Sequence, residues 1–146
     1  MRATKLVMKL KHLKYKERLE RLKLQTLRYR RTRGDMIEVY KILTESNCKS
    51  VNSELELHKK RVTRGHNLKL VNSRCHYDLR KYSFAVRVVN IWNSLPVSVI
   101  SANNVNTFKN RLDKCWANQK LIFDYESSLT GTGNRSFVDS SDIIDF

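Results

Sequence analysis

The chain has 146 residues, a length that fits one domain of ordinary size and excludes two substantial ones. Its 29 Lys and Arg against 14 Asp and Glu give a formal net charge of +15, which favours a polyanionic partner, with nucleic acid as the first candidate. No apolar run approaches the roughly 20 residues that span a bilayer, and the amino terminus is too charged for a signal peptide. We therefore expect an intracellular protein of the nucleus or cytoplasm without a membrane partner.

The charge is unevenly distributed along the chain. Residues 1–33 hold 13 basic and two acidic residues, whereas residues 124–146 hold one arginine and five acids. A solvated charged face is the alternative explanation of such a run. Aromatic residues interleaved with the arginines favour nucleic-acid binding over that alternative.

Residues 1–45 are predicted to form a basic helical segment. Apolar residues at helical spacing predict one helix over residues 4–14, with Leu6, Leu10 and Leu13 as its stripe, and a second over residues 15–24. The stripe with its lysines also fits a membrane-surface helix, which we rank below nucleic-acid binding. Thr26 is the expected N-cap of a longer helix to about residue 43. A glycine in its middle, Gly34, indicates close packing, a local kink or an incidental residue.

The following residues predict a linker and then an extended segment. Residues 46–61 are rich in Ser, Asn and charge and have no period, which is typical of a linker. Residues 62–71 predict a short strand or hairpin, because Leu68 and Leu70 alternate with polar residues.

Residues 62–123 are expected to form a helical domain built on two paired helices. The first covers residues 79–95 and ends at Pro96, the only proline. After a connector, the second covers residues 104–118. Residues 124–146 are expected to be a disordered acidic and polar tail. The fold class is thus mostly α, with about five helices. Core positions follow the helical period: Phe84, Val88, Ile91, Trp92, Leu95, Val105, Phe108, Leu112 and Trp116.

Catalytic and metal-binding patterns do not emerge from the sequence. Two-metal nucleotidyl transfer needs paired carboxylates, whereas Asp35, Asp78 and Asp113 are isolated and are better explained as ion-pair partners of arginines and lysines. Three widely separated cysteines do not suggest disulfides. We expect no catalytic residue, cofactor, metal or small-molecule substrate. The remote alternatives, a Cys–His catalytic pair and a zinc site, lack the required motif or spacing; their residues are Cys48, His58, His66, Cys75 and His76.

Three basic clusters are the candidate phosphate contacts. Four arginines within residues 28–33 spread around more than half of a helix, so at least two must face solvent or a ligand. The second cluster flanks Gly65 on a predicted turn, and the third lies on the helix over residues 79–95. Trp92 and Trp116 are expected in the core rather than stacked on bases. The predicted contacts are Arg28, Arg30, Arg31, Arg33, Arg64, His66, Arg80, Lys81 and Arg87.

Several ordered motifs carry a family resemblance that covers about residues 2–116. The most specific runs are Arg30-Arg31-Thr32-Arg33-Gly34-Asp35-Met36-Ile37-Glu38-Val39-Tyr40-Lys41 and Arg87-Val88-Val89-Asn90-Ile91-Trp92-Asn93-Ser94-Leu95-Pro96. Shorter marks are Arg2-Ala3-Thr4-Lys5-Leu6, Tyr15-Lys16-Glu17-Arg18-Leu19, Thr63-Arg64-Gly65-His66 and Phe108-Lys109-Asn110-Arg111-Leu112-Asp113-Lys114-Cys115-Trp116. In this order they resemble the thumb and carboxy-terminal region that follows the palm of non-LTR (LINE-type) retrotransposon reverse transcriptases.

The resemblance implies a fragment that grips template and primer while a separate palm performs chemistry. Endonuclease, fingers and palm are not found in this chain, so we expect no polymerase activity from it alone. RNA or DNA, as a template–primer duplex or a single strand, is the implied partner, and the missing polymerase core is the implied packing partner. The alternatives are a helical protein-interaction module that uses the stripe of Leu6, Leu10 and Leu13, and a non-functional relic of a decayed element.

Overall fold

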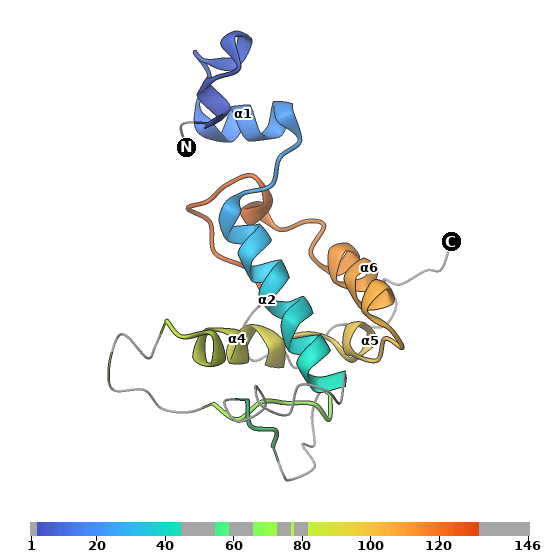
Figure 1. Ribbon diagram of the computed structural model, residues 1–146. Helices are drawn as coiled ribbons and strands as arrows, with labels where there is room; N and C mark the ends of the chain where they lie inside the picture. The colour runs from blue at the N-terminus through green and yellow to red at the C-terminus, as the bar shows by residue number, and fades with distance from the viewer. Residues whose placement is uncertain (1–2, 45–54, 59–65, 73–76, 78–81, 132–146) are drawn as a thin grey trace. The chain divides into compact units, whose positions relative to one another are not determined.

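The computed structural model describes residues 3–44, 55–58, 66–72, 77 and 82–131, and these are mostly helical, as predicted (Figure 1). The chain divides into two compact units, one of Met1–Gly34 with Asn118–Thr130 and the other of Asp35–Ala117 with Gly131–Phe146. Within the described ranges, no helix has the length and apolar character needed to cross a membrane. The α-helices are α1 (Tyr15–Leu22), α2 (Leu27–Thr44), α4 (Phe84–Asn93), α5 (Val97–Ile100) and α6 (Val105–Cys115), and the 3-10 helices are η1 (Ala3–Lys5), η2 (Met8–Leu10) and η3 (Lys120–Ile122).

The first unit begins with the two short 3-10 helices η1 and η2, where the sequence predicts one α-helix over residues 4–14. Backbone N–H groups of Leu6, Leu10 and Leu13 donate to carbonyls three residues earlier, at 2.9 to 3.1 Å, so the turns are tighter than α-helical ones. Like charges one α-helical turn apart, at Lys5 and Lys9, disfavour the predicted helix. The expected apolar stripe is therefore broken, and Leu6 is 82% exposed.

A buried arginine holds this amino-terminal segment to α1. Arg18 is only 4% exposed. Its Nε donates to Thr4 Oγ1 at 3.2 Å, its Nη1 donates to the Leu13 carbonyl, and its guanidinium lies over the Tyr15 ring. These contacts satisfy the charge with oxygen acceptors and a ring face, and no acidic partner is found among the described residues.

Residues 119–130 form a closed loop in the same unit. Gln119 and Thr130 close its ends, because the Thr130 N–H donates to Gln119 Oε1 at 2.9 Å and Gln119 Nε2 donates to the Thr130 carbonyl at 3.2 Å. The loop is held to α1 by a Lys16–Asp124 ion pair of 3.6 Å and by an edge-to-face contact between Tyr15 and Tyr125. Residues 124–130 of the expected tail over residues 124–146 therefore belong to this ordered loop, whereas residues 132–146 lie outside the described residues.

Thr26 is the N-cap of α2, as predicted. Its Oγ1 accepts a hydrogen bond from the Tyr29 N–H at 3.2 Å. The same hydroxyl donates to the Leu121 carbonyl at 2.6 Å, and the Thr26 N–H donates to the Ile122 carbonyl at 2.8 Å. One fully buried side chain therefore both starts the helix and docks η3 against it.

The core of the second unit is an aromatic cluster from three helices. Tyr40 of α2 stacks on Phe108 of α6 with ring centroids 4.3 Å apart, and Trp92 of α4 lies 6.0 Å from Phe108. Tyr40 Oη also donates to the Ala102 carbonyl at 2.6 Å, so its polar end is satisfied in the short turn between α5 and α6. Trp92 and Trp116 are 0% and 4% exposed, which confirms their predicted core position.

The extended segment around Leu70 is fastened to α4. Where the sequence predicts a strand or hairpin over residues 62–71, the described residues contain one isolated antiparallel bridge, between Leu57 and Leu70. The Asn93 side chain pairs with Leu70 on both backbone groups: its Oδ1 accepts from the N–H and its Nδ2 donates to the carbonyl, each at 2.8 Å. Trp92 Nε1 donates to the Leu68 carbonyl at 2.7 Å.

The remaining predicted helices are present with shorter bounds, and the helix predicted over residues 79–95 starts only at Phe84, because Tyr82 and Ser83 are not helical. α4 ends before Pro96 and α6 starts at Val105, where the Asn104 side chain accepts from the Thr107 N–H at 2.7 Å. The predicted connector over residues 97–100 is itself the short helix α5, which packs against α6. Close packing at Gly34 is wrong, since a Cβ there would meet nothing within 4 Å. Residues 46–54 and 59–61 of the predicted linker lie outside the described residues.

Thr26→Ala tests the shared cap. Loss of the hydroxyl removes the N-cap bond and leaves the Leu121 carbonyl without its donor, so we expect a free energy of unfolding lower by about 1.5 kcal/mol in urea denaturation. Thr32→Ala is the matched control. The Thr32 hydroxyl donates only to the Arg28 carbonyl one turn earlier in α2, so its loss should cost under about 0.5 kcal/mol. Equal effects of the two substitutions would contradict the role assigned to Thr26.

Candidate nucleic-acid interface

The first turns of α2 present two arginines that are open to solvent. Arg30 and Arg31 are both exposed, and no described residue makes a hydrogen bond or ion pair with either guanidinium. Adjacent helix positions point about 100° apart, so the two side chains leave α2 in different directions. Their charges are available to an external anion.

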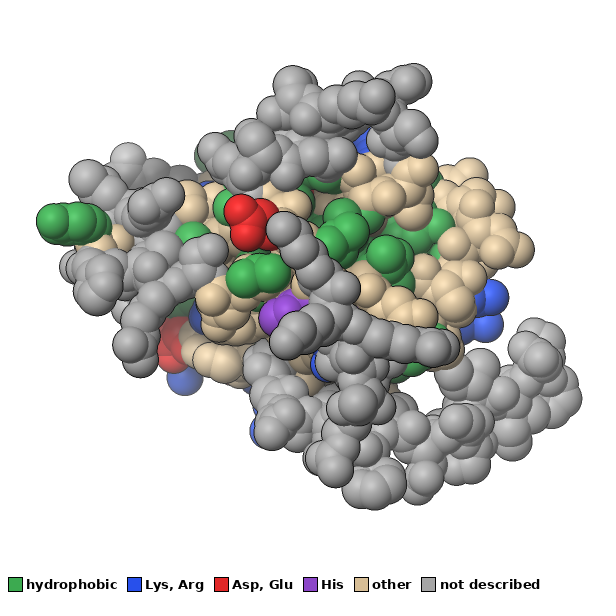
Figure 2. Space-filling model, turned by 90° about the horizontal axis from the view of Figure 1, so that it is seen from below, with side chains coloured by type: hydrophobic (Ala, Val, Ile, Leu, Met, Phe, Trp, Pro, Cys, Tyr) green, Lys and Arg blue, Asp and Glu red, His purple; other side chains and the backbone are tan. Residues whose placement is uncertain are grey.

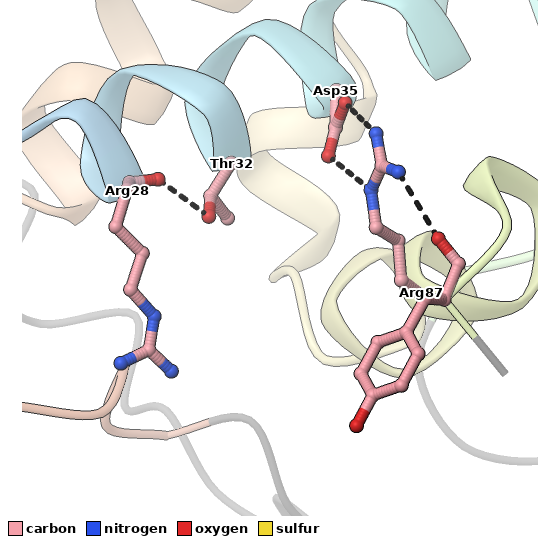
Figure 3. A network of polar contacts seen from close by, with 5 residues as sticks. Arg28, Thr32, Asp35 and Arg87 are labelled. Carbon is pink, nitrogen blue, oxygen red and sulfur yellow. Dashed lines mark hydrogen bonds and ion pairs between the residues drawn. The ribbon is translucent and has the colours of Figure 1, made fainter. Parts of the chain in front are cut away.

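Two further arginines of the predicted cluster have partners within the protein. Arg28 is exposed, yet its Nη1 donates to the carbonyls of Tyr125 and Ser127 at 3.3 and 3.2 Å, which ties the closed loop to α2. Figure 3 shows its side chain directed away from Thr32, whose hydroxyl binds the Arg28 carbonyl. Arg33 is half-buried and is engaged in an interaction of its own. The sequence cluster of four thus contributes two open guanidinium groups.

Arg87 in the second unit is held by a carboxylate. Its Nε and Nη2 each lie 2.9 Å from one oxygen of Asp35, in a two-point ion pair (Figure 3). Nη1 donates to the Tyr82 carbonyl at 3.3 Å, and the guanidinium lies over the Phe84 ring. Hydrogen bonding to Asp35 raises the pKa of Arg87, although the side chain is partly exposed. Asp35 is therefore an ion-pair partner, as expected, but its arginine is 52 residues away.

His66 lies in the core rather than on an exposed turn. It is 4% exposed, its ring meets the Trp92 ring edge-on, and its Nε2 lies 3.3 Å from the Trp92 carbonyl. The carbonyl is only an acceptor, so Nε2 carries the proton, and the buried acceptor Nδ1 has no hydrogen-bond partner among the described residues. Burial lowers the pKa of His66, and the nearby Lys69 adds to this effect. The predicted phosphate contact at His66 is withdrawn because the ring has no exposed face.

Three of the predicted contacts, Arg64, Arg80 and Lys81, lie outside the described residues. Across the described part of the chain, no group of three or more His, Cys, Asp or Glu side chains could hold a metal ion. Figure 2 shows a face on which hydrophobic side chains gather near the centre and the Lys and Arg side chains are scattered. Among the described residues seen on that face, the Lys and Arg side chains form no continuous surface.

The sequence did not predict that these arginines form hydrogen bonds within the protein, because their acceptors are mostly backbone carbonyls. Arg111 is a further case: it is exposed on α6, but its Nη1 donates to the Ser98 carbonyl at 2.7 Å. No local pattern marks a carbonyl as an acceptor for a distant side chain. The net charge includes arginines that already have partners within the protein as well as those open to solvent.

Comparison of the chain with protein-family models, with curated proteins and with solved structures finds no match. The resemblance to a reverse transcriptase tail therefore remains an expectation from the sequence motifs.

Asp35→Asn tests the ion pair between α2 and α4. Loss of the carboxylate charge removes the partner of Arg87, and we expect the free energy of unfolding to fall by about 1 kcal/mol, since the pair is two-point but partly exposed. Glu38→Gln is the matched control, because its 3.7 Å pair with Lys41 is exposed on both sides, and it should cost under about 0.5 kcal/mol. Urea denaturation of both variants measures the difference, and equal losses would contradict a special role for Asp35.

The burial of His66 predicts a stability that depends on pH. The folded-state pKa is below the unfolded value of 6.5, so the unfolded chain takes up the proton more readily. The contribution of His66 to the free energy of unfolding is complete above the unfolded-state pKa. It is lost as the pH falls from the unfolded-state pKa through the folded-state pKa. His66→Gln keeps a donor for the Trp92 carbonyl but does not titrate, and its thermal unfolding should vary less than wild type between about pH 7 and pH 5. His58→Gln changes an exposed histidine and should behave as wild type.

Proposed function

We propose that the chain binds the sugar–phosphate backbone of RNA or DNA with little sequence preference, and that it derives from the region after the palm of a LINE-type retrotransposon reverse transcriptase. The proposal assigns no catalytic step, cofactor or metal to this chain. Template–primer duplex and single strand are both candidate ligands.

The observation that carries the proposal is the pair of open guanidinium groups at Arg30 and Arg31. They lie in a stretch, residues 1–33, that holds 13 basic and two acidic residues. Exposed lysines of the same unit, such as Lys5, Lys9 and Lys11, add to the positive field, which steers a polyanion to this unit.

The physical basis of such binding is release of the counterions that condense on nucleic acid. Each phosphate neutralised by Lys or Arg adds roughly 0.9 to the salt slope for duplex DNA and roughly 0.7 for single strands. Guanidinium groups also form two-point hydrogen bonds with phosphate oxygens, which a lysine does not. Contacts of this kind fix position on the backbone and do not read the sequence.

A second candidate function is a protein-interaction module, which the exposed apolar run of the amino-terminal segment favours. Leu6, Val7 and Met8 are 82%, 41% and 82% exposed, and consecutive exposed apolar residues of this kind suit a docking surface. Such a module does not need the charges of α2.

Arg30→Ala/Arg31→Ala tests the first proposal and separates it from the second. We expect weaker binding of labelled duplex and single-stranded oligonucleotides at low salt, and a salt slope smaller in magnitude by about 1 to 2, because up to two phosphate contacts are lost. Fluorescence anisotropy titrations at several salt concentrations measure both quantities.

The control is Lys41→Ala/Arg111→Ala, which removes the same net charge from side chains that already have partners, Glu38 and the Ser98 carbonyl. It should change the slope little. Absence of binding by the wild-type protein at low salt, or equal effects of the two double variants, would contradict the assigned interface.

A further inference from the structure

Tyr82 is an exposed aromatic residue in a unit whose other large rings are mostly buried. It is 70% exposed, whereas Tyr40, Trp92 and Phe108 are at most 2% exposed. It precedes the N-cap residue of α4. None of the described residues makes a hydrogen bond or a ring contact with its side chain.

The backbone of Tyr82 is nevertheless held in place. Arg87 Nη1 donates to the Tyr82 carbonyl, and the same guanidinium is fixed by both oxygens of Asp35 and lies over the Phe84 ring. The Arg87 N–H groups thus donate to acceptors within the protein. The bond to the Tyr82 carbonyl anchors the turn that carries the Tyr82 ring. A ring on an anchored backbone loses less conformational freedom when it binds a ligand.

Positive charge lies next to this ring in the sequence. Arg80 and Lys81 directly precede Tyr82 in the sequence, so the chain carries two positive charges immediately before this residue. Single-strand binders hold bases by stacking them on exposed aromatic rings, and they attract the phosphates with Lys and Arg. Duplex offers no equivalent surface, because neighbouring base pairs cover the base faces.

From this arrangement we infer that Tyr82 stacks on an unpaired base, so that the second unit prefers single-stranded nucleic acid over duplex. The inference rests on the proposed function and deepens it, because it names the class of nucleic acid and the contacting ring. The face of a base is common to RNA and DNA, so the stacking does not distinguish them. Arg87 is a positioning residue in this arrangement and not a phosphate contact.

The test is anisotropy titration of full-length protein with labelled uridine and thymidine oligonucleotides and with a duplex of the same length. Tyr82→Ala should bind both single strands about tenfold more weakly and the duplex as wild type does. Tyr82→Phe keeps the ring and should retain wild-type affinity. Tyr77→Ala removes an equally exposed ring, at 79%, that Arg87 does not anchor, and should have little effect.

Arg87→Lys keeps the charge but loses the two-point pair, so the preference for single strands should fall while the salt slope stays constant. An unchanged preference would overturn the positioning role of Arg87. Wild-type single-strand affinity in Tyr82→Ala, or an equal loss in Tyr77→Ala, would overturn the stacking inference while leaving backbone binding intact. Failure of the wild-type protein to bind any oligonucleotide would instead overturn the proposed function.

Discussion

Burial of the Trp92 indole is the interaction on which the second unit depends. Its ring lies against Phe108, its Nε1 donates to the Leu68 carbonyl, and its own carbonyl lies within hydrogen-bonding distance of His66 Nε2. One side chain of α4 thereby packs the helical core and orders the extended segment beside it. Burial of the Trp92 ring removes a large apolar area from water, and its N–H hydrogen bond fixes the orientation of the indole. The same contacts explain why His66 is taken out of solvent.

The described arginines fall into two groups, those with acceptors within the protein and those open to solvent, and the net charge does not distinguish them. Arg18, Arg28, Arg87 and Arg111 donate to carbonyl, hydroxyl or carboxylate oxygens of the protein and stabilise turns, loops and helix ends. Arg30 and Arg31 have no such acceptor among the described residues. Because a guanidinium presents five donors in a planar fork, it suits both tasks equally. A strongly basic composition therefore overstates the number of cations that an external phosphate meets.

The sequence predicted the features that follow from local rules. Helical spacing located α1, α2, α4 and α6 and most of their buried residues, although Phe84, Ile91 and Val105 are only half-buried, and the N-cap preference located Thr26. The errors concern contacts between distant residues. The loop over residues 119–130 is ordered by Lys16, Arg28 and Thr26, none of which is near it in sequence. Likewise, the flanking Gly65 suggested an exposed turn for His66, whereas packing against Trp92 decides its position. In the candidate interface, sequence named the arginines but not their partners.

The pairing of Asn93 with Leu70 has a consequence for association between chains. At the antiparallel bridge, the His58 and Val71 N–H groups donate to the Lys69 and Glu56 carbonyls, so the Leu70 N–H and carbonyl face away from Leu57. Left open, those two groups would be a strand edge able to recruit another chain by β-addition. The carboxamide of Asn93 occupies both of them, in the manner of a neighbouring peptide unit. This side-chain amide thus protects the chain against edge-to-edge aggregation without requiring another strand.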